Sequence, residues 1–363
     1  MCLHLRSRGA HAQVMGRPNS GKTTLFRALA GLGVVVIGTI AVVAIVTRAS
    51  PTGAEPQGVR WARLGIDDAL REAGDRHQRV LVKFDAEWCS YCKKLEEEVL
   101  ATRTGAELTR DMIAVRYDFD DPSNRSLVER YVVLGLPTVL VLTPDGTQVG
   151  RIMGYDGKNE WLTEARAAKR ASDPVPALRA AHAASPADPH RALELGEALL
   201  VRGAPDEGEA LLERVTWMRA ADGSTEDAAN ALFLLGRYYH RVRRDPRTAR
   251  HVWRELASRF PRSENAGGAW WWYAKAEAEL GRHEVGYEAL RARARAEPAN
   301  VDAAHELADY VAEHSMRSHF AEARTLLTGA IPRAPESDRR DMQALATRLA
   351  GTGAAAGAAG AAP

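Results

Sequence analysis

The stretch that decides the fold runs from Val80 to Leu100 and reads VLVKFDAEWCSYCKKLEEEVL. Its first residues, 80–84, are apolar except for Lys83, which predicts a buried strand. A helix is expected to begin at Cys89, directly after the strand. Cys89 would then lie near the helix N-terminus, where unpaired N–H groups and the helix dipole stabilise a thiolate.

The pair Cys89 and Cys92 points to thiol chemistry. Cys89 is predicted to be the nucleophile, and Cys92, one helical turn further on and more enclosed, is suited to resolving a mixed disulfide. A zinc site would need about four ligands, and no second Cys-x-x-Cys or well-spaced histidine pair is present, so we expect no metal. A purely structural disulfide is disfavoured, because closing so short a loop constrains the unfolded chain little.

The surrounding sequence alternates helix and strand patterns over residues 59–172. Helices threaded between apolar strands predict an α/β sandwich. The expected elements are helix 66–76, strand 80–84, a helix from 89, strand 113–117, helix 123–131, strand 138–142, a turn at 144–146, strand 148–153 and helix 158–170.

Together with GLPT at 135–138, the stretch around Trp88 and the two cysteines resembles the thioredoxin superfamily. It is most similar to the soluble reductase domain of the transmembrane thiol:disulfide interchange proteins. The resemblance covers about 59–172 and implies a catalytic role for Pro137, as a cis proline facing the disulfide. It also implies that the backbone of Leu136 pairs with the substrate chain and that Trp88 flanks the site. On physical grounds alone, Pro137 could be an ordinary trans proline.

Two departures limit what the resemblance implies. The family has a buried carboxylate, which accepts the proton of the resolving cysteine, where this chain has Lys83. Asp85 and Glu87 are candidates for the proton acceptor, or else solvated loop charges. Ser90 and Tyr91, candidates for substrate binding, replace the family's Gly-Pro, so reduction potential and direction do not transfer. The resemblance favours a reductase or isomerase over an oxidase.

The second half of the chain, 173–349, shows only helical spacing. Large-small pairs at Leu195-Gly196, Leu235-Gly236, Tyr273-Ala274 and Leu307-Ala308 recur at offsets of 40, 38 and 34 residues. Each pair resembles the first helix of a tetratricopeptide repeat, which implies an all-α repeat domain that docks proteins. Any array of helical hairpins would satisfy the same packing requirement. At least two of the four aromatic residues at 270–273 are expected in the helix-packing core.

The N-terminus predicts the compartment. Residues 28–47 are 20 uncharged residues, enough to span ~30 Å of hydrocarbon. The preceding stub, 1–27, carries basic and no acidic residues, so the rest of the chain is expected outside the cytoplasm. This predicts a single-pass anchor in the inner membrane, with domains facing the periplasm or the cell exterior. Thr47 and Ala49 also fit a small-x-small cleavage site, so a removable signal peptide stays an alternative to the anchor.

Three further segments carry less information. Residues 48–58 are predicted to be a linker, and the Ala- and Gly-rich tail 350–363 is expected to be disordered. The segment from Gly16 to Thr23, GRPNSGKT, fits a phosphate-binding loop. No convincing strand precedes it, and its helix would continue into the membrane segment, so we expect no nucleotide binding. A net charge of +2 likewise predicts no nucleic-acid partner.

These observations predict a membrane-anchored thiol:disulfide oxidoreductase with no cofactor beyond a redox-active Cys89–Cys92 disulfide. Its partners would be protein thiols and disulfides, together with a transmembrane electron-transfer partner, because the outer compartment has no soluble reductant pool like that of the cytosol. The competing hypothesis is a non-catalytic adaptor. In that case the helical repeats bind partners, and the thioredoxin-like part is a structural module.

Overall fold

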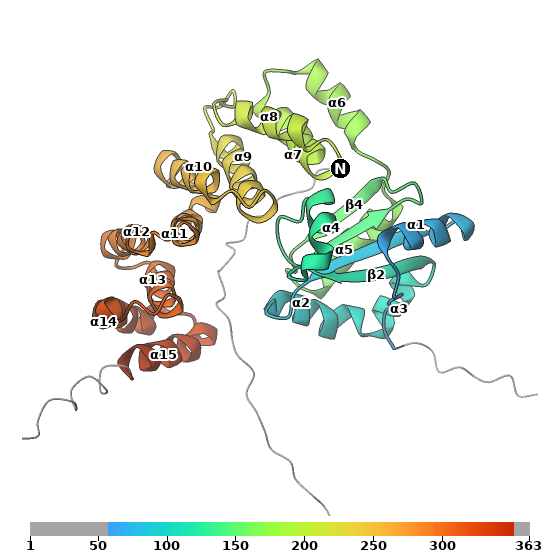
Figure 1. Cartoon of the computed structure of the whole chain (residues 1–363). Helices are drawn as coiled ribbons and strands as arrows, with labels where there is room; N and C mark the ends of the chain where they lie inside the picture. Colours follow the sequence, from blue (N-terminus) through green and yellow to red (C-terminus); the bar gives the residue numbers. More distant parts are fainter. Residues whose placement is uncertain (1–56, 352–363) are drawn as a thin grey trace, which may run out of the picture.

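The computed structural model describes residues 57–351. A mixed α/β domain comes first, and an arc of helices follows it (Figure 1). The predicted anchor 28–47, the stub 1–27, the Gly16–Thr23 motif and nearly all of the predicted linker and tail lie outside these residues. Within 57–351, no helix has the length and hydropathy needed to cross a bilayer.

The first domain is built on a four-stranded sheet in the order β2-β1-β3-β4. β1 (Arg79–Asp85) pairs in parallel with β2 (Met112–Asp118) and antiparallel with β3 (Thr138–Leu142). β4 (Gln148–Met153) pairs antiparallel with β3 across a tight turn. All four strands lie where the sequence predicts them, because each is a short apolar run bounded by polar or turn residues.

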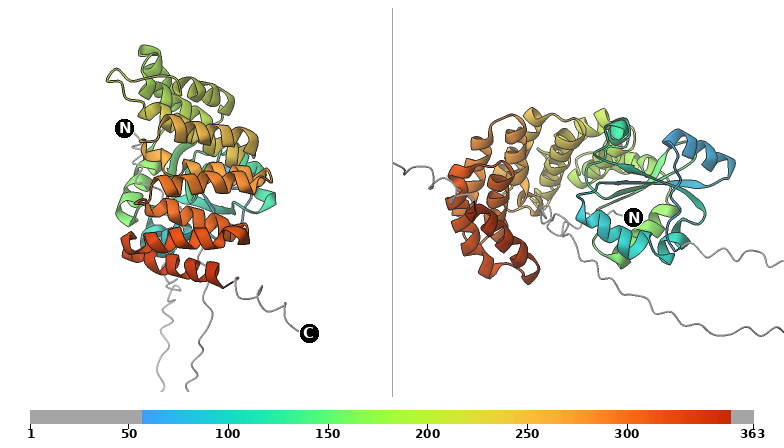
Figure 2. Two further views of the ribbon diagram at one scale, coloured as in Figure 1. Left: turned by 90° about the vertical axis from the view of Figure 1, so that its left-hand side faces the viewer. Right: turned by 60° about the horizontal axis from the view of Figure 1, so that its bottom comes forward.

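Helices cover both faces of this sheet (Figure 2). Successive strand residues point to opposite faces, so Leu81 packs on one side while Val80 and Val82 pack on the other. The Val80 side is covered by α1 (Ile66–Asp75) and α4 (Arg125–Arg130). The Leu81 side is covered by three helices, namely α2 (Ser90–Leu95), α3 (Arg103–Thr109) and α5 (Lys158–Arg170). The result is the predicted α/β sandwich.

Three helical features differ from the sequence prediction. A π-helical turn, η1 (Glu96–Leu100), follows α2, and α3 was not predicted. The α3 sequence, RTGAELT, is poor in strong helix formers. Its Gly105 instead allows close packing, since a Cβ there would lie 2.6 Å from the carbonyl oxygens of Val99 and Leu100. A short 3₁₀ turn, η2 (Pro122–Asn124), also delays the start of α4.

The second domain is all helical, as predicted, and its helices stack in sequence order (Figure 2). Its elements are α6 (Val175–Ala184), α7 (Pro189–Val201), α8 (Pro205–Val215), α9 (Glu226–Arg237), η3 (Tyr238–Val242), α10 (Pro246–Arg259), η4 (Glu264–Ala266), α11 (Ala269–Glu279), α12 (His283–Ala296), α13 (Val301–Glu313), η5 (Arg317–His319), α14 (Phe320–Ala330), η6 (Ile331–Arg333) and α15 (Glu336–Ala350).

The predicted large-small pairs lie on α7, α9, α11 and α13, each of which packs on the helix that follows it. Gly236 shows why a small residue is needed, because a Cβ there would meet the Trp253 ring at 2.8 Å. In the aromatic run 270–273, Trp271 and Tyr273 are buried, and Trp270 and Trp272 are half-buried. The helical region is consistent with repeats, and its assignment to the tetratricopeptide family stays a prediction.

The helical arc packs against the sheet domain. Val132 and Leu134 belong to the same apolar core as Leu195 and Leu235 of the arc. Arg125 of α4 donates hydrogen bonds to the carbonyl oxygens of Arg241 and Val242 in η3. In Figure 1 the side of the sheet domain that carries α2 faces the inner side of the arc.

Candidate active site

The two cysteines form a disulfide at the start of α2, with their Cα atoms 5.2 Å apart. Cys89 is the N-cap residue, and its Sγ accepts a hydrogen bond of 3.1 Å from the backbone N–H of Cys92. This agrees with the predicted place of Cys89 near a helix N-terminus. Both residues are almost fully buried in the disulfide form, Cys89 at 4% and Cys92 at 3% exposure, so the predicted greater enclosure of Cys92 amounts to a small difference here.

A small apolar cluster explains this burial. Ala86, Cys89 and Cys92 form its centre, and Tyr91, Phe119 and Leu136 pack around them. Phe119 and Leu136 come from separate segments, after β2 and before β3. Sequence reasoning identified Leu136 through its motif, but nothing in the local pattern indicated Phe119.

The loop before β3 lies against the disulfide. The Leu136–Pro137 peptide bond is cis, as the resemblance implies. The Thr138 hydroxyl donates a 2.7 Å hydrogen bond to the carbonyl of Gly135, and the Gly154 N–H donates a 2.8 Å bond to the carbonyl of Pro137. These bonds hold the loop in place, so Leu136 keeps its contact with the cysteine cluster. The pairing of its backbone with a substrate chain stays a prediction.

Trp88 lies beside the disulfide with 48% of its surface exposed. Its indole N–H donates a 2.5 Å hydrogen bond to the carboxylate of Asp120, which orients the ring from the loop after β2. Of the residues between the cysteines, Ser90 is exposed, and Tyr91 is half-buried with the Lys94 ammonium 5.6 Å from its ring centre. Of these side chains, Tyr91 packs on the cysteine cluster.

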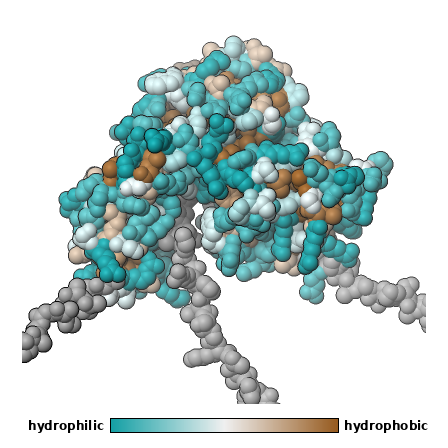
Figure 3. All heavy atoms as spheres, in the orientation of Figure 1, coloured by the Kyte–Doolittle hydropathy of each residue, from teal (hydrophilic) through white to brown (hydrophobic). Residues whose placement is uncertain are grey.

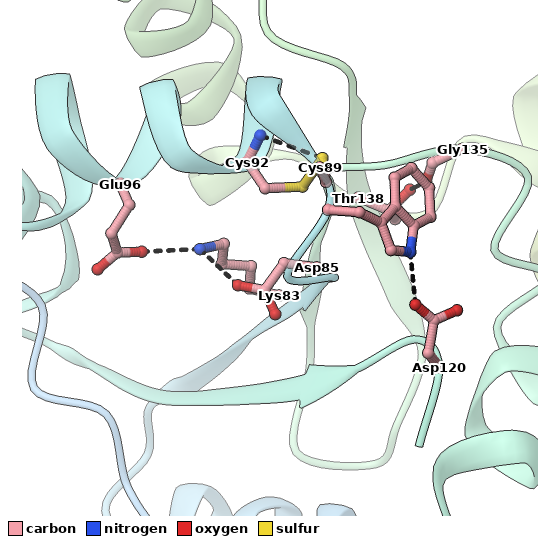
Figure 4. Close-up of a disulfide and its surroundings, with 9 residues drawn as sticks. Lys83, Asp85, Cys89, Cys92, Glu96, Asp120, Gly135 and Thr138 are labelled. Carbon is pink, nitrogen blue, oxygen red and sulfur yellow. Dashed lines mark hydrogen bonds and ion pairs between the residues drawn. A yellow bond between two sulfur atoms is a disulfide. The ribbon is translucent and has the colours of Figure 1, made fainter. Parts of the chain in front are cut away.

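Beneath α2, a buried lysine joins two carboxylates (Figure 4). Lys83 points from β1 to the same face as Leu81 and is 1% exposed. Its Nζ lies 2.8 Å from Asp85 Oδ2 and 2.7 Å from Glu96 Oε2. A buried ammonium is costly unless it is paired, and these two carboxylates compensate it.

The two residues predicted as candidate proton acceptors lie in different surroundings. Asp85 belongs to the lysine cluster, whereas Glu87 is exposed on the loop before Trp88 and lies outside the cluster. Glu96 was missed, although one signal was available. It follows Cys92 by four residues, and such residues share a helix face. The backbone N–H of Glu96 bonds to the carbonyl of Cys92, which places both on the same helical turn.

Residues 57–351 contain no group of three or more His, Cys, Asp or Glu side chains placed to hold a metal ion. A thiolate at Cys89 would be stabilised by the hydrogen bond that the backbone N–H of Cys92 donates to its sulfur and by the dipole of α2.

Comparison with known proteins gives a partial match. Residues 66–169 match the family model of a thioredoxin-like domain. The chain is 34% identical over 101 residues to the thiol:disulfide interchange protein DsbD of Pseudomonas fluorescens, which is 27% of this chain and 17% of that protein. It is 36% identical over 75 residues to protein disulfide-isomerase 1 of Dictyostelium discoideum, which is 20% of each chain.

A solved thioredoxin from Thermus thermophilus is 31% identical and covers 30% of this chain and 86% of its own, with a TM-score of 0.28. The matched segments cover no more than a fifth of the length of these two curated relatives.

Proposed function

We propose that the thioredoxin-like domain at 66–169 makes this chain a thiol:disulfide oxidoreductase that acts on proteins. The match confirms the predicted superfamily, and thiol:disulfide interchange and disulfide-isomerase relatives support the thiol chemistry. The observation that carries the proposal is the Cys89–Cys92 disulfide at the start of α2, packed against Leu136 of the cis-proline loop.

The reaction is an exchange of two electrons and two protons. In the reduced protein, the Cys89 thiolate attacks a substrate disulfide, forms a mixed disulfide and releases one substrate thiolate, which takes up a proton. Cys92, deprotonated in turn, attacks the Cys89 sulfur and releases the second substrate thiol. The Cys89–Cys92 bond forms, and the substrate disulfide is reduced.

The Cys92 proton needs an acceptor, and Glu96 and Asp85 are the carboxylates we assign to it. Both are held by Lys83, and Glu96 shares a helical turn with Cys92. Lys83 occupies the site of the family's buried carboxylate and anchors the two acids that take over the role. Glu87 is not part of this arrangement.

The direction we propose is reduction or isomerisation, which requires electrons from a transmembrane partner. This part rests on the resemblance, on the interchange relatives and on the uncharged segment 28–47, which we propose as an inner-membrane anchor that places the domains in the periplasm or outside the cell. Protease added to intact spheroplasts should digest the domains and leave a fragment that contains 1–47. A chain fully protected until lysis would contradict this topology.

Trapping tests the enzymatic proposal. The full-length Cys92→Ser variant should accumulate mixed disulfides with cellular proteins through Cys89, since the resolving step is lost. Cys89→Ser is the matched control and should accumulate none. If neither variant forms a mixed disulfide and the wild-type pair does not exchange with small thiols, the chain is not an oxidoreductase, and the adaptor hypothesis replaces the proposal.

A further inference from the structure

Two arginines of the helical arc lie next to segments of the sheet domain that pack on the disulfide. Arg237 ends α9, and Arg241 follows one turn later in η3. Their guanidinium groups flank the Trp272 ring, with the carbons at their centres 4.9 Å and 5.2 Å from the ring centre. Both side chains are half-buried against aromatic rings.

Each guanidinium also reaches the sheet domain at a segment that borders the cysteines. Arg237 Nη2 lies 3.7 Å from where a Cβ on Gly135 would be, next to the cis-proline loop. The Arg241 guanidinium lies 5.8 Å from the ring centre of Phe119, which packs on the cysteine cluster. The two guanidinium groups therefore lie next to two separate segments whose residues pack on the disulfide.

Neither guanidinium is in ion-pair contact with a carboxylate in the part of the chain that the structure describes. Among residues 57–351, no carboxylate lies within 4 Å of either guanidinium, and the Nε atoms of both are buried without a hydrogen-bond partner. Asp120, the acid that acts on Arg241 from a distance, accepts a hydrogen bond from the Trp88 indole. Burial lowers the pKa of Arg237 well below its ordinary value and that of Arg241 to about 10, with Asp120 partly opposing the shift at Arg241.

Resting on the proposed function, we infer that Arg237 and Arg241 bind acidic side chains that flank the target cysteine of a substrate protein. A desolvated arginine without a partner is costly, and a carboxylate that arrives with the substrate supplies the missing hydrogen bonds and charge. The occupant is a polypeptide because the site it borders exchanges protein disulfides. In the view of Figure 3 the hydrophobic areas of the surface are separated by hydrophilic ones. Two guanidinium groups recognise a partner through charge complementarity.

Peptide substrates test the inference on the full-length chain in neutral detergent. Three peptides share one disulfide and carry Glu, Gln or Lys at the flanking positions, and kcat/KM for their reduction is measured at low and high salt. We expect the Glu peptide to react roughly tenfold faster than the Gln peptide at low salt, and the Lys peptide to be slowest, with the differences shrinking as salt is added.

Variants assign the effect to the arginine pair. In Arg237→Gln/Arg241→Gln the Glu-to-Gln ratio should fall to near one, and Arg237→Lys/Arg241→Lys should keep a large part of it. Arg340→Gln, which removes an exposed arginine on α15, is the matched control and should keep the wild-type ratio. Equal rates of the wild type for all three peptides would overturn the inference even if a variant fails to fold. Absence of exchange with every peptide and with an uncharged small disulfide would instead overturn the proposed function.

Discussion

Replacing Lys83 with methionine should destabilise the sheet domain strongly. The variant keeps the length of the side chain but removes the ammonium that lies 2.8 Å from Asp85 and 2.7 Å from Glu96. Two carboxylates then remain under α2 without their cation. Because Lys83 is buried, no surface charge is available at the same place to compensate them.

The magnitude follows from the geometry. At these distances and an effective dielectric constant of about 20, each ion pair has a Coulomb energy of about 6 kcal/mol. Desolvation offsets most of this energy, and removing one partner of a buried pair costs about 3–5 kcal/mol. The side chains of Asp85 and Glu96 are 25% and 31% exposed, so water relieves part of the cost. We expect a net loss of about 2–4 kcal/mol.

Hydrogen–deuterium exchange followed by mass spectrometry measures this loss in the full-length chain, from the protection of β1 and β3. Lys93→Met is the matched control, because it removes an exposed lysine from α2, the helix above the cluster, and should change protection little. The triple variant Lys83→Met/Asp85→Asn/Glu96→Gln should recover a large part of the stability. A loss below about 1 kcal/mol in Lys83→Met, or an equal loss in the triple variant, would refute the electrostatic explanation.

Three further predictions concern the rest of the chain. Gly236→Ala should lower the unfolding free energy of the helical domain by about 1–3 kcal/mol, because its Cβ would overlap the Trp253 ring; a urea melt unchanged from wild type would contradict the packing. Burial raises the pKa of Asp309 from 3.8 to about 8, so the folded state holds a proton that the unfolded chain releases. The unfolding free energy should therefore fall as the pH rises from about 4 to about 8. The slope that Asp309 contributes is at most about 1.4 kcal/mol per pH unit. Asp309→Asn should flatten that slope in urea melts at pH 5 and 7.5, and an unchanged slope would assign it to other groups. The wild type and Lys22→Ala should both fail to bind ATP and GTP in equilibrium dialysis, and binding by the wild type that the variant loses would show a nucleotide site at Gly16–Thr23.

The sheet domain could be predicted well because its signals are local. The apolar run of Val80, Leu81 and Val82 and that of β3 are visible in the sequence, and such runs are typical of strands buried on both faces. The helix start at Cys89 follows from the strand that precedes it. By contrast, α3 has weak helix formers, and packing around Gly105 decides its structure.

The missed parts of the site depend on contacts between distant segments. The sequence shows that Lys83 replaces the buried carboxylate of the thioredoxin superfamily, but only the structure shows that Glu96 and Asp85 form ion pairs with it. Phe119 reaches the cysteines from the end of β2, and Arg237 and Arg241 reach the same site from the other domain. No periodicity in one sequence encodes how a helical arc docks on a sheet domain.

The most direct test of the account is the redox equilibrium of the Cys89–Cys92 pair in the full-length chain. The protein is equilibrated in thiol buffers of graded potential, and free thiols are alkylated and counted by mass, with Cys89→Ser as the control. We expect a two-electron transition that the control lacks, at a potential of about −270 mV, as for a reductase. A midpoint near about −120 mV would contradict the proposed direction and indicate an oxidase. A pair that never exchanges with the buffer would contradict the enzymatic function itself.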